Sequence, residues 1–315
     1  MLTRRQLRVK VMQCIYALTQ SQDDSLEKQE KFLKVSIDNT YTLYLVMLSL
    51  LKELFAMAEN HVKHDSKKYV TTESDSYPDK EKFLKNQLLQ QIVSNKLLTK
   101  ELAKRKIGHW YLNADYVKII YKAIVTSRLY SLYMSKEDST YGEDKNLIID
   151  LFREVIAPND KLYEFFEDDE LTWVDDIPLV NTFLLKMLKN AKIEQPESFF
   201  LPQLVKDQED LDFTSTLLTK TLLNNKMLEN EIQAKTPNWD KDRIADIDAI
   251  LLKMAICELL HFPSIPERVS INEYLEIAKE YSTPKSSIFI NGILDKLVKE
   301  YKSEGKLKKT GRGLL

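Results

Sequence analysis

Three arginines and one tyrosine near the N-terminus have the spacing to contact a nucleic acid. In a helix that turns about 100° per residue, Arg5, Arg8 and Tyr16 fall in one sector beside the apolar positions, and Arg4 lies nearby in the first turn. Arginine can bind a phosphate through two hydrogen bonds, and an aromatic ring can stack on an unpaired base. The pattern predicts an edge that binds single-stranded RNA. The alternative is a solvated basic turn beside a half-buried Tyr16.

A second candidate site lies at the start of the last predicted helix. It comprises Lys285, Ser286, Ser287, Phe289 and Asn291. Unpaired backbone amides at a helix N-terminus favour anions, and the lysine and the serines surround that position. Gly292 stands inside the same helix, where glycine costs about 1 kcal/mol against alanine. We expect another group to approach the backbone closely there; the alternative is a second helix packed against Gly292.

Common nucleotide-binding and hydrolytic motifs are missing from the sequence. Only Gly108 and Gly142 precede Gly292 among the six glycines, so neither a GxGxxG nor a GxxxxGK loop can form. No GxSxG or HExxH motif occurs. Asp242 and Asp246 share a face near a helix start, where the helix dipole favours acids without any catalytic role. The sequence therefore predicts a protein that is not an enzyme and binds no cofactor.

The histidines and cysteines also have structural explanations. His61 and His64 lie three residues apart beside Asp65, but no Glu-x-x-His partner or cysteine pair completes a zinc site. Cys14 and Cys257 lie far apart on apolar helical faces. We expect buried, reduced thiols rather than a disulfide or a metal site.

Basic side chains concentrate towards the two ends of the sequence. Residues 1–22 contain four basic and no acidic side chains, and residues 296–315 contain seven basic and two acidic ones, although the net charge is −2. Both segments could face a polyanion. Residues 164–176 hold seven carboxylates in thirteen positions. We expect that stretch to be solvated and flexible and to repel nucleic acid.

The pattern of apolar residues predicts an all-α protein. Apolar side chains recur every three or four positions, and the alternation typical of strands is nearly absent. The expected helices cover 3–19, 25–60, 80–106, 111–134, 144–156, 177–191 and 208–235. Breaks are expected at 63–78 and 190–202, where polar residues and prolines gather.

Three more helices are expected in the C-terminal part. Asp240 should begin a helix that ends before Pro263. Ser270 and Glu273 match a capping box, in which the serine accepts a hydrogen bond from the N3 amide and the glutamate reaches back. Residues 282–284 should cap the last helix, with the proline in its first turn.

The sequence also predicts where the protein resides. Residues 1–10 are basic but lead into a polar helix without a small-residue cleavage site, so no signal peptide is expected. The most apolar stretch, 41–51, is short of the roughly 20 residues that a membrane span needs. We expect a core helix there and a cytoplasmic protein.

An ordered set of motifs then resembles one family. The motifs are Trp239-Asp240-x-x-Arg243-Ile244-x-x-Ile247-Asp248-x-Ile250-Leu251, Ala255-Ile256-x-Glu258-Leu259, Ile265-Pro266, Ser270-Ile271-Asn272-Glu273, Ile277-Ala278-Lys279 and Phe289-Ile290-Asn291-Gly292-Ile293-Leu294-Asp295. Together with Arg4-Arg5-x-x-Arg8 and Gln13-x-x-Tyr16, they resemble the NusB transcription antitermination family.

The resemblance implies a fold, a function and partners. The fold would be a NusB-like helical bundle with a large helical insertion after the first helix. The function would be transcription antitermination through binding the boxA element of ribosomal RNA transcripts. The partners would be that single-stranded RNA, the small-subunit ribosomal protein NusE and an antitermination complex on RNA polymerase.

The resemblance also assigns roles to single residues. Arg4, Arg5 and Arg8 would contact RNA phosphates, and Tyr16, in one motif with Gln13, would pack or stack at the RNA face. A second RNA-contacting edge would consist of Lys285, Ser286, Ser287, Phe289 and Asn291. Asp248 would face the ribosomal protein.

By this resemblance, the chain divides into four parts, and two other functions are possible. Residues 1–25 are the first helix of the bundle, 26–207 the insertion, 208–302 the remaining bundle and 303–315 a basic flexible tail. One alternative is a helical adaptor in which the insertion binds protein and RNA binding is lost. The other is an RNA-modifying enzyme, since NusB-like domains also precede ribosomal RNA cytosine methyltransferases; no cofactor loop or catalytic cysteine motif supports it.

Overall fold

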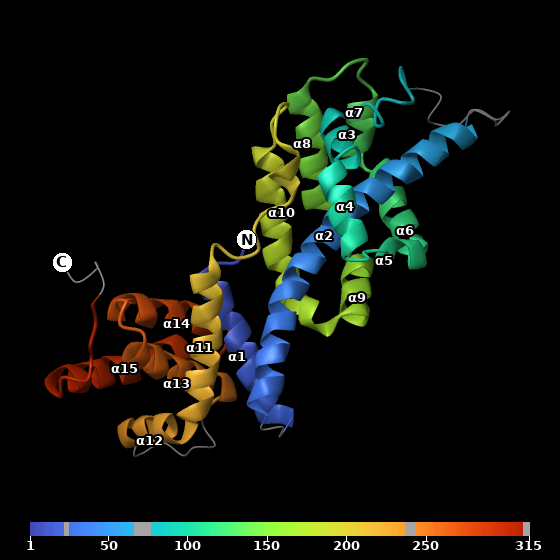
Figure 1. Cartoon of the computed structure of the whole chain (residues 1–315). Coiled ribbons are helices and arrows are strands. Elements are labelled where there is room, and N and C mark those ends of the chain that lie inside the picture. The colour runs from blue at the N-terminus through green and yellow to red at the C-terminus, as the bar shows by residue number, and fades with distance from the viewer. Residues whose placement is uncertain (22–24, 66–76, 237–243, 311–315) are drawn as a thin grey trace. The chain divides into compact units, whose positions relative to one another are not determined.

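The fold is helical throughout the described part of the chain. A computed structural model describes residues 1–21, 25–65, 77–236 and 244–310, and within these ranges it contains helices and no strand. The predicted all-α class is therefore confirmed. The chain forms two compact units, one from residues 1–37 and 204–315 and the other from 38–203 (Figure 1). The limits predicted for an insertion, 26–207, stay a prediction.

The first unit is a bundle around the apolar stripe of its first helix. Its helices are α1 (Arg4–Ser21), α11 (Gln208–Leu223), α12 (Asn225–Lys235), α13 (Asp246–His261), α14 (Glu267–Tyr281) and α15 (Ser286–Ser303). Helix α1 packs against α11, α13 and α14, while α13, α14 and α15 pack against one another (Figure 1). Leu7 and Val11 of α1, Leu251 of α13 and Ile277 of α14 have no exposed surface. Burial of such side chains, at about 25 cal/mol per Å² of apolar surface, holds the helices together.

Helix α2 (Leu26–Asp65) is the longest in the structure, with 40 residues. Its residues 26–37 belong to the first unit and the rest to the second. By length and composition it is the one described helix that could cross a membrane, but 67% of its most apolar window is buried inside the protein. Such burial is typical of a core helix, which the stretch 41–51 was expected to be.

The second unit consists of α2 from residue 38 onwards and shorter helices. They are α3 (Gln87–Val93), α4 (Lys96–Lys104), α5 (His109–Leu112), α6 (Ala114–Val125), α7 (Arg128–Met134), α8 (Tyr141–Leu151), α9 (Asp160–Asp169) and α10 (Ile177–Asn190), with a π-helical turn η2 (Phe152–Ile156) and 3-10 turns η3 (Leu171–Asp176) and η4 (Glu197–Phe200). The single helices predicted at 80–106 and 111–134 are each divided. New helices begin after three N-cap residues, whose side chains accept hydrogen bonds from the backbone amides three residues on. These residues are Asn86 before α3, Asn95 before α4 and Ser127 before α7.

The acidic stretch 164–176 is ordered, which corrects the expectation of a flexible segment. Its apolar residues decide the outcome: Phe165, Phe166 and Trp173 are buried, and their rings pack with that of Trp110 or with one another. The indole N–H of Trp173 donates to the carbonyl of Asn39 at 2.9 Å. The carboxylates alternate with this apolar face, so most of them stay in water while the segment packs.

Two predicted helix caps are wrong. Helix α14 begins at Glu267, so Ser270 lies inside it and its hydroxyl donates to Glu258 instead of capping. Helix α15 begins at Ser286 after Lys285, which places Pro284 before the helix rather than in its first turn. The predicted start at Asp240 lies outside the described residues.

Both cysteines are buried and free. Burial raises the pKa of the Cys14 thiol to about 12 and that of Cys257 to about 11. At neutral pH both are therefore unreactive thiols that contribute apolar packing.

Candidate nucleic-acid interface

Arg8 is buried in the centre of a polar cluster. Its guanidinium donates two hydrogen bonds, of 2.8 and 2.7 Å, to the carboxylate of Glu258, and the two residues are 2% and 0% exposed. Ser270 and Tyr274 donate their hydroxyl protons to the same carboxylate at 2.7 and 3.0 Å. Burial alone would lower the pKa of Arg8, but the hydrogen bonds to Glu258 raise it above its ordinary value. Arg8 thus carries its charge into the core and fixes α1 against α13 and α14.

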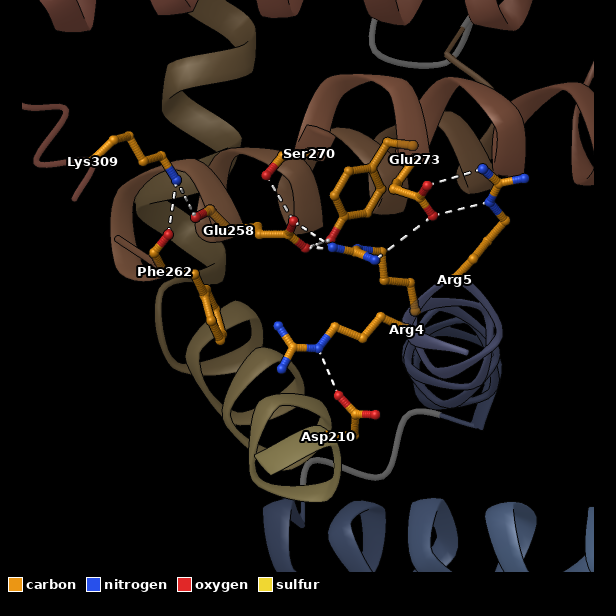
Figure 2. Close-up of polar contacts among 10 residues, drawn as sticks. Arg4, Arg5, Asp210, Glu258, Phe262, Ser270, Glu273 and Lys309 are labelled. Atoms are coloured by element: carbon orange, nitrogen blue, oxygen red, sulfur yellow. Dashed lines mark hydrogen bonds and ion pairs between the residues drawn. The ribbon is translucent and has the colours of Figure 1, made fainter. Parts of the chain in front are cut away.

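Arg4 and Arg5 remain at the surface, and each is paired with a carboxylate. Arg5 donates two hydrogen bonds of 2.9 Å to Glu273 of α14, and its side chain is 39% exposed. Arg4 donates to Asp210 of α11 at 2.6 Å (Figure 2) and to Glu209 at 2.7 Å. The pairs with Glu273 and Glu209 are partly exposed and contribute about 0–1 kcal/mol each, whereas Asp210 is buried. A phosphate could therefore replace Glu273 and Glu209 at little cost.

A cleft of about 610 Å³ runs along this arginine face. It is lined by Thr3, Arg4, Arg5, Gln6, Arg8, Ser264, Ile265, Pro266, Val269 and Glu273. A lining that combines arginine charge with apolar side chains suits a ligand that has both charged and flat apolar groups. The cleft brings the arginines together with the Ile-Pro segment between α13 and α14.

The pair between Arg5 and Glu273 gives a testable dependence on pH. The hydrogen bonds from Arg5 hold the pKa of Glu273 below its ordinary value of 4.5. The pair therefore stabilises the fold above pH 4.5, and this stabilisation is lost as the pH falls through the lower pKa of the folded state. The free energy of urea unfolding of wild type should exceed that of Glu273→Gln by up to about 1 kcal/mol at about pH 6, and this difference should shrink progressively as the pH falls below 4.5. Glu209→Gln, at a more exposed carboxylate, is the control; a gap that is the same at every pH would contradict the prediction.

Asp248 of α13 is buried next to the start of α15. Its carboxylate accepts hydrogen bonds from the hydroxyls of Ser282 at 2.6 Å and Ser286 at 2.7 Å, and it is 5% exposed. The carboxylate of Asp248 thus lies at the N-terminus of α15, where the sequence analysis predicted that an anion would bind. Asp248 holds the loop before α15 in the free protein, and its assignment to a partner surface stays a prediction.

The other predicted residues of α15 differ in their exposure. Lys285 is exposed, Ser286 is buried, and Ser287, Phe289 and Asn291 are half-buried. Asn291 donates to Asp295 at 3.2 Å on the helix surface.

Gly292 is exposed, and among the described residues nothing lies within 4 Å of where its Cβ would stand. Neither the close approach nor the helix packing expected at Gly292 is therefore made by any residue that the structure describes.

Tyr16 and the loop before α15 line a recess of about 410 Å³ in the first unit, which none of the predicted residues of the second region lines. It is lined by Tyr16, Ala245, Asp246, Ile247, Tyr281, Ser282, Thr283 and Pro284. Tyr16 of α1 is 40% exposed, and Pro284 directly precedes Lys285. The recess therefore joins the second half of α1 to the start of α15. Gln13 is half-buried one turn before Tyr16 and is not part of its lining.

Several residues of this face were missed from the sequence. Glu273 was assigned to a cap, and Asp246 only to the helix dipole, although the first pairs with Arg5 and the second lines the recess. Lys309, expected in a flexible tail, donates to the carbonyls of Glu258 and Phe262 at 3.2 and 2.9 Å and satisfies the end of α13 (Figure 2). A glutamate between two buried positions, Cys257 and Leu259, was the one signal that a buried cation would be needed.

Comparison with known proteins agrees with these observations. The sequence profile described as the NusB family matches residues 179–299, which begin inside α10 and exclude α1. The transcription antitermination protein NusB of Chloroherpeton thalassium is 40% identical over 129 residues, which are 41% of this chain and 61% of that protein. The NusB protein of Salinibacter ruber is 43% identical over 109 residues, 35% of this chain and 68% of that protein. The NusB protein of Clostridium kluyveri is 42% identical over 93 residues, which are 30% of this chain and 60% of that protein.

The chain thus spans about 60 to 68% of the length of these relatives. No solved structure matches it. The profile, the ordered motifs from Ile244 to Asp295 and the 43% identity to the Salinibacter ruber protein, 68% of which is covered, point to one family. The chain belongs to the NusB family.

Proposed function

We propose that this protein is a transcription antitermination factor that acts in the cytoplasm by binding and not by catalysis. Its RNA ligand is a boxA-type single strand of ribosomal RNA transcripts, bound together with the ribosomal protein NusE in a complex on RNA polymerase. The observation that carries the proposal is the recess, where Tyr16 of α1 meets the loop that leads into α15. Family membership supports it, because the relatives are transcription antitermination proteins.

The buried and exposed arginines have different tasks in this proposal. Arg5 and Arg4 are partly exposed and pair with the solvent-accessible carboxylates of Glu273 and Glu209, so they contact phosphates. Arg8 is enclosed by Glu258, Ser270 and Tyr274, so it positions α1 and leaves the phosphate contacts to its neighbours. Lys285 and the half-buried side chains of α15 form the second edge.

The test is a fluorescence titration with a boxA-like RNA and a scrambled strand at several salt concentrations. With three or four phosphate contacts, log K against log salt should have a slope of about −2 to −3 for wild type. Arg5→Ala should weaken binding and flatten the slope by about 0.7. The measurement is made with and without NusE. Equal binding of both strands under both conditions, or none, would overturn the proposal.

One observation favours the adaptor as a second candidate. The second unit exposes large apolar side chains: Tyr111 is 89% exposed, Leu112 82% and Leu171 77%. Such residues are typical of surfaces that bind protein. The double variant Tyr111→Ala/Leu112→Ala therefore serves as the matched control in the titration, and RNA binding should be unchanged in it. Loss of protein partners with intact RNA binding would assign this surface its own role.

A further inference from the structure

The recess next to Tyr16 has walls that suit a flat, uncharged ring. Tyr16 and Tyr281 contribute aromatic surface, and Ile247 and Pro284 contribute apolar surface. Aromatic side chains stack on unpaired bases with about 1–3 kcal/mol per base. A ring that enters from solvent can therefore stack on the aromatic part of this lining.

The charges around the recess disfavour a phosphate there. Asp246 lies in the first turn of α13, lines the recess and is exposed. Below it, Asp248 places a second carboxylate between Ser282 and Ser286. Two carboxylates offset the positive ends of α13 and α15, so the anion that those helix ends would attract is already supplied by the protein. The phosphates of a bound strand are better placed at the arginine cleft, which Tyr16 and Asp246 do not line.

A carboxylate at the edge of an aromatic recess accepts hydrogen bonds and donates none. Among the bases, guanine presents an imino N–H and an amino group side by side, which match the two oxygens of one carboxylate. Cytosine and adenine present a single amino group beside an acceptor nitrogen. Uracil presents one N–H between two carbonyl oxygens, which a carboxylate repels. Hydrogen bonds to the Watson–Crick edge of an unpaired base, which carries these groups, are a usual source of sequence specificity in RNA binding.

We propose that the recess binds one unstacked guanine of the RNA strand, with Tyr16 stacked on the base and Asp246 accepting hydrogen bonds from its N1–H and 2-amino groups. This inference rests on the proposed RNA binding and adds to it the position and the identity of one recognised base. Asp246 is then a residue that determines specificity, and the arginines of α1 supply affinity that is independent of sequence.

The experiment uses the full chain and ten-nucleotide uridine strands with a fluorescent label. One strand contains a single central guanosine, one a single inosine, which lacks the 2-amino group, and one only uridine. Wild type should bind the guanosine strand about tenfold more tightly than the uridine strand, with inosine between them. Asp246→Asn should bind all three strands within about twofold of one another. Asp212→Asn, which removes an exposed carboxylate on α11 outside the recess, should behave as wild type.

A second pair of variants tests the stacking. Tyr16→Ala should weaken binding of the guanosine strand about tenfold, whereas Tyr16→Phe keeps the ring and should stay within about twofold of wild type. If wild type binds the three strands equally, or if Asp246→Asn keeps the order of wild type, the recess does not recognise guanine, although RNA binding itself still stands. If wild type binds none of the strands and no boxA-like RNA, both the inference and the proposed function are overturned.

Discussion

Glu258→Leu should lower the free energy of unfolding by about 3–5 kcal/mol. The substitution leaves the guanidinium of Arg8, which is 2% exposed, without its partner of two hydrogen bonds. Ser270 and Tyr274 lose the acceptor of their hydroxyl protons in the same step. Arg8 then keeps only its longer ion pair with Glu273, at 3.8 Å, and a poorly paired buried cation between three helices is strongly unfavourable. Urea unfolding followed by circular dichroism measures the loss.

A second variant separates the pair from simple packing. In Arg8→Met/Glu258→Leu both charges are replaced by apolar side chains, so no buried charge stays unpaired. The double variant should be more stable than Glu258→Leu alone, although Ser270 and Tyr274 still lack an acceptor. A loss below about 1 kcal/mol in the single variant, or a double variant that is less stable still, would show that the pair does not hold α1 in place.

Trp173→Ala should destabilise the second unit by about 3–5 kcal/mol. The indole is 2% exposed, its ring lies against those of His109 and Phe166, and its N–H donates to Asn39. Alanine would leave a cavity among these rings and remove one hydrogen bond to a carbonyl of α2. The loss is measured as the shift of the urea midpoint, again by circular dichroism.

The matched control for this variant is the next residue along the chain. Val174 belongs to the same 3-10 turn but is 38% exposed, so Val174→Ala should cost less than about 1 kcal/mol. If the two variants are equally stable, the stretch 164–176 does not depend on its apolar face, and the expectation of a solvated segment would be restored.

The helical class could be predicted from the sequence because the spacing of apolar residues depends only on neighbours along the chain. The position of Arg8 could not. Its spacing on the helix placed it beside Arg5, but Glu258, which draws it into the core, lies 250 residues away. The same limit explains Ser270 and Glu273: the pattern of a capping box is local, whereas both side chains are used in contacts with other helices. Tyr16 and Pro284 were each noticed, but only the fold brings them to one recess.

The two buried thiols can be used to measure how often the first unit opens. Because Cys14 and Cys257 are enclosed and hold their protons at neutral pH, an alkylating reagent can reach them only when the first unit opens. Their rate of alkylation therefore reports how often α1 and α13 separate. A cysteine introduced on the outer face of α15, at the exposed Ile288, would react at once and could carry a dye without replacing either native thiol. The dye on the surface cysteine would then report ligand binding, and slow alkylation of the two native thiols would report rare opening of the core.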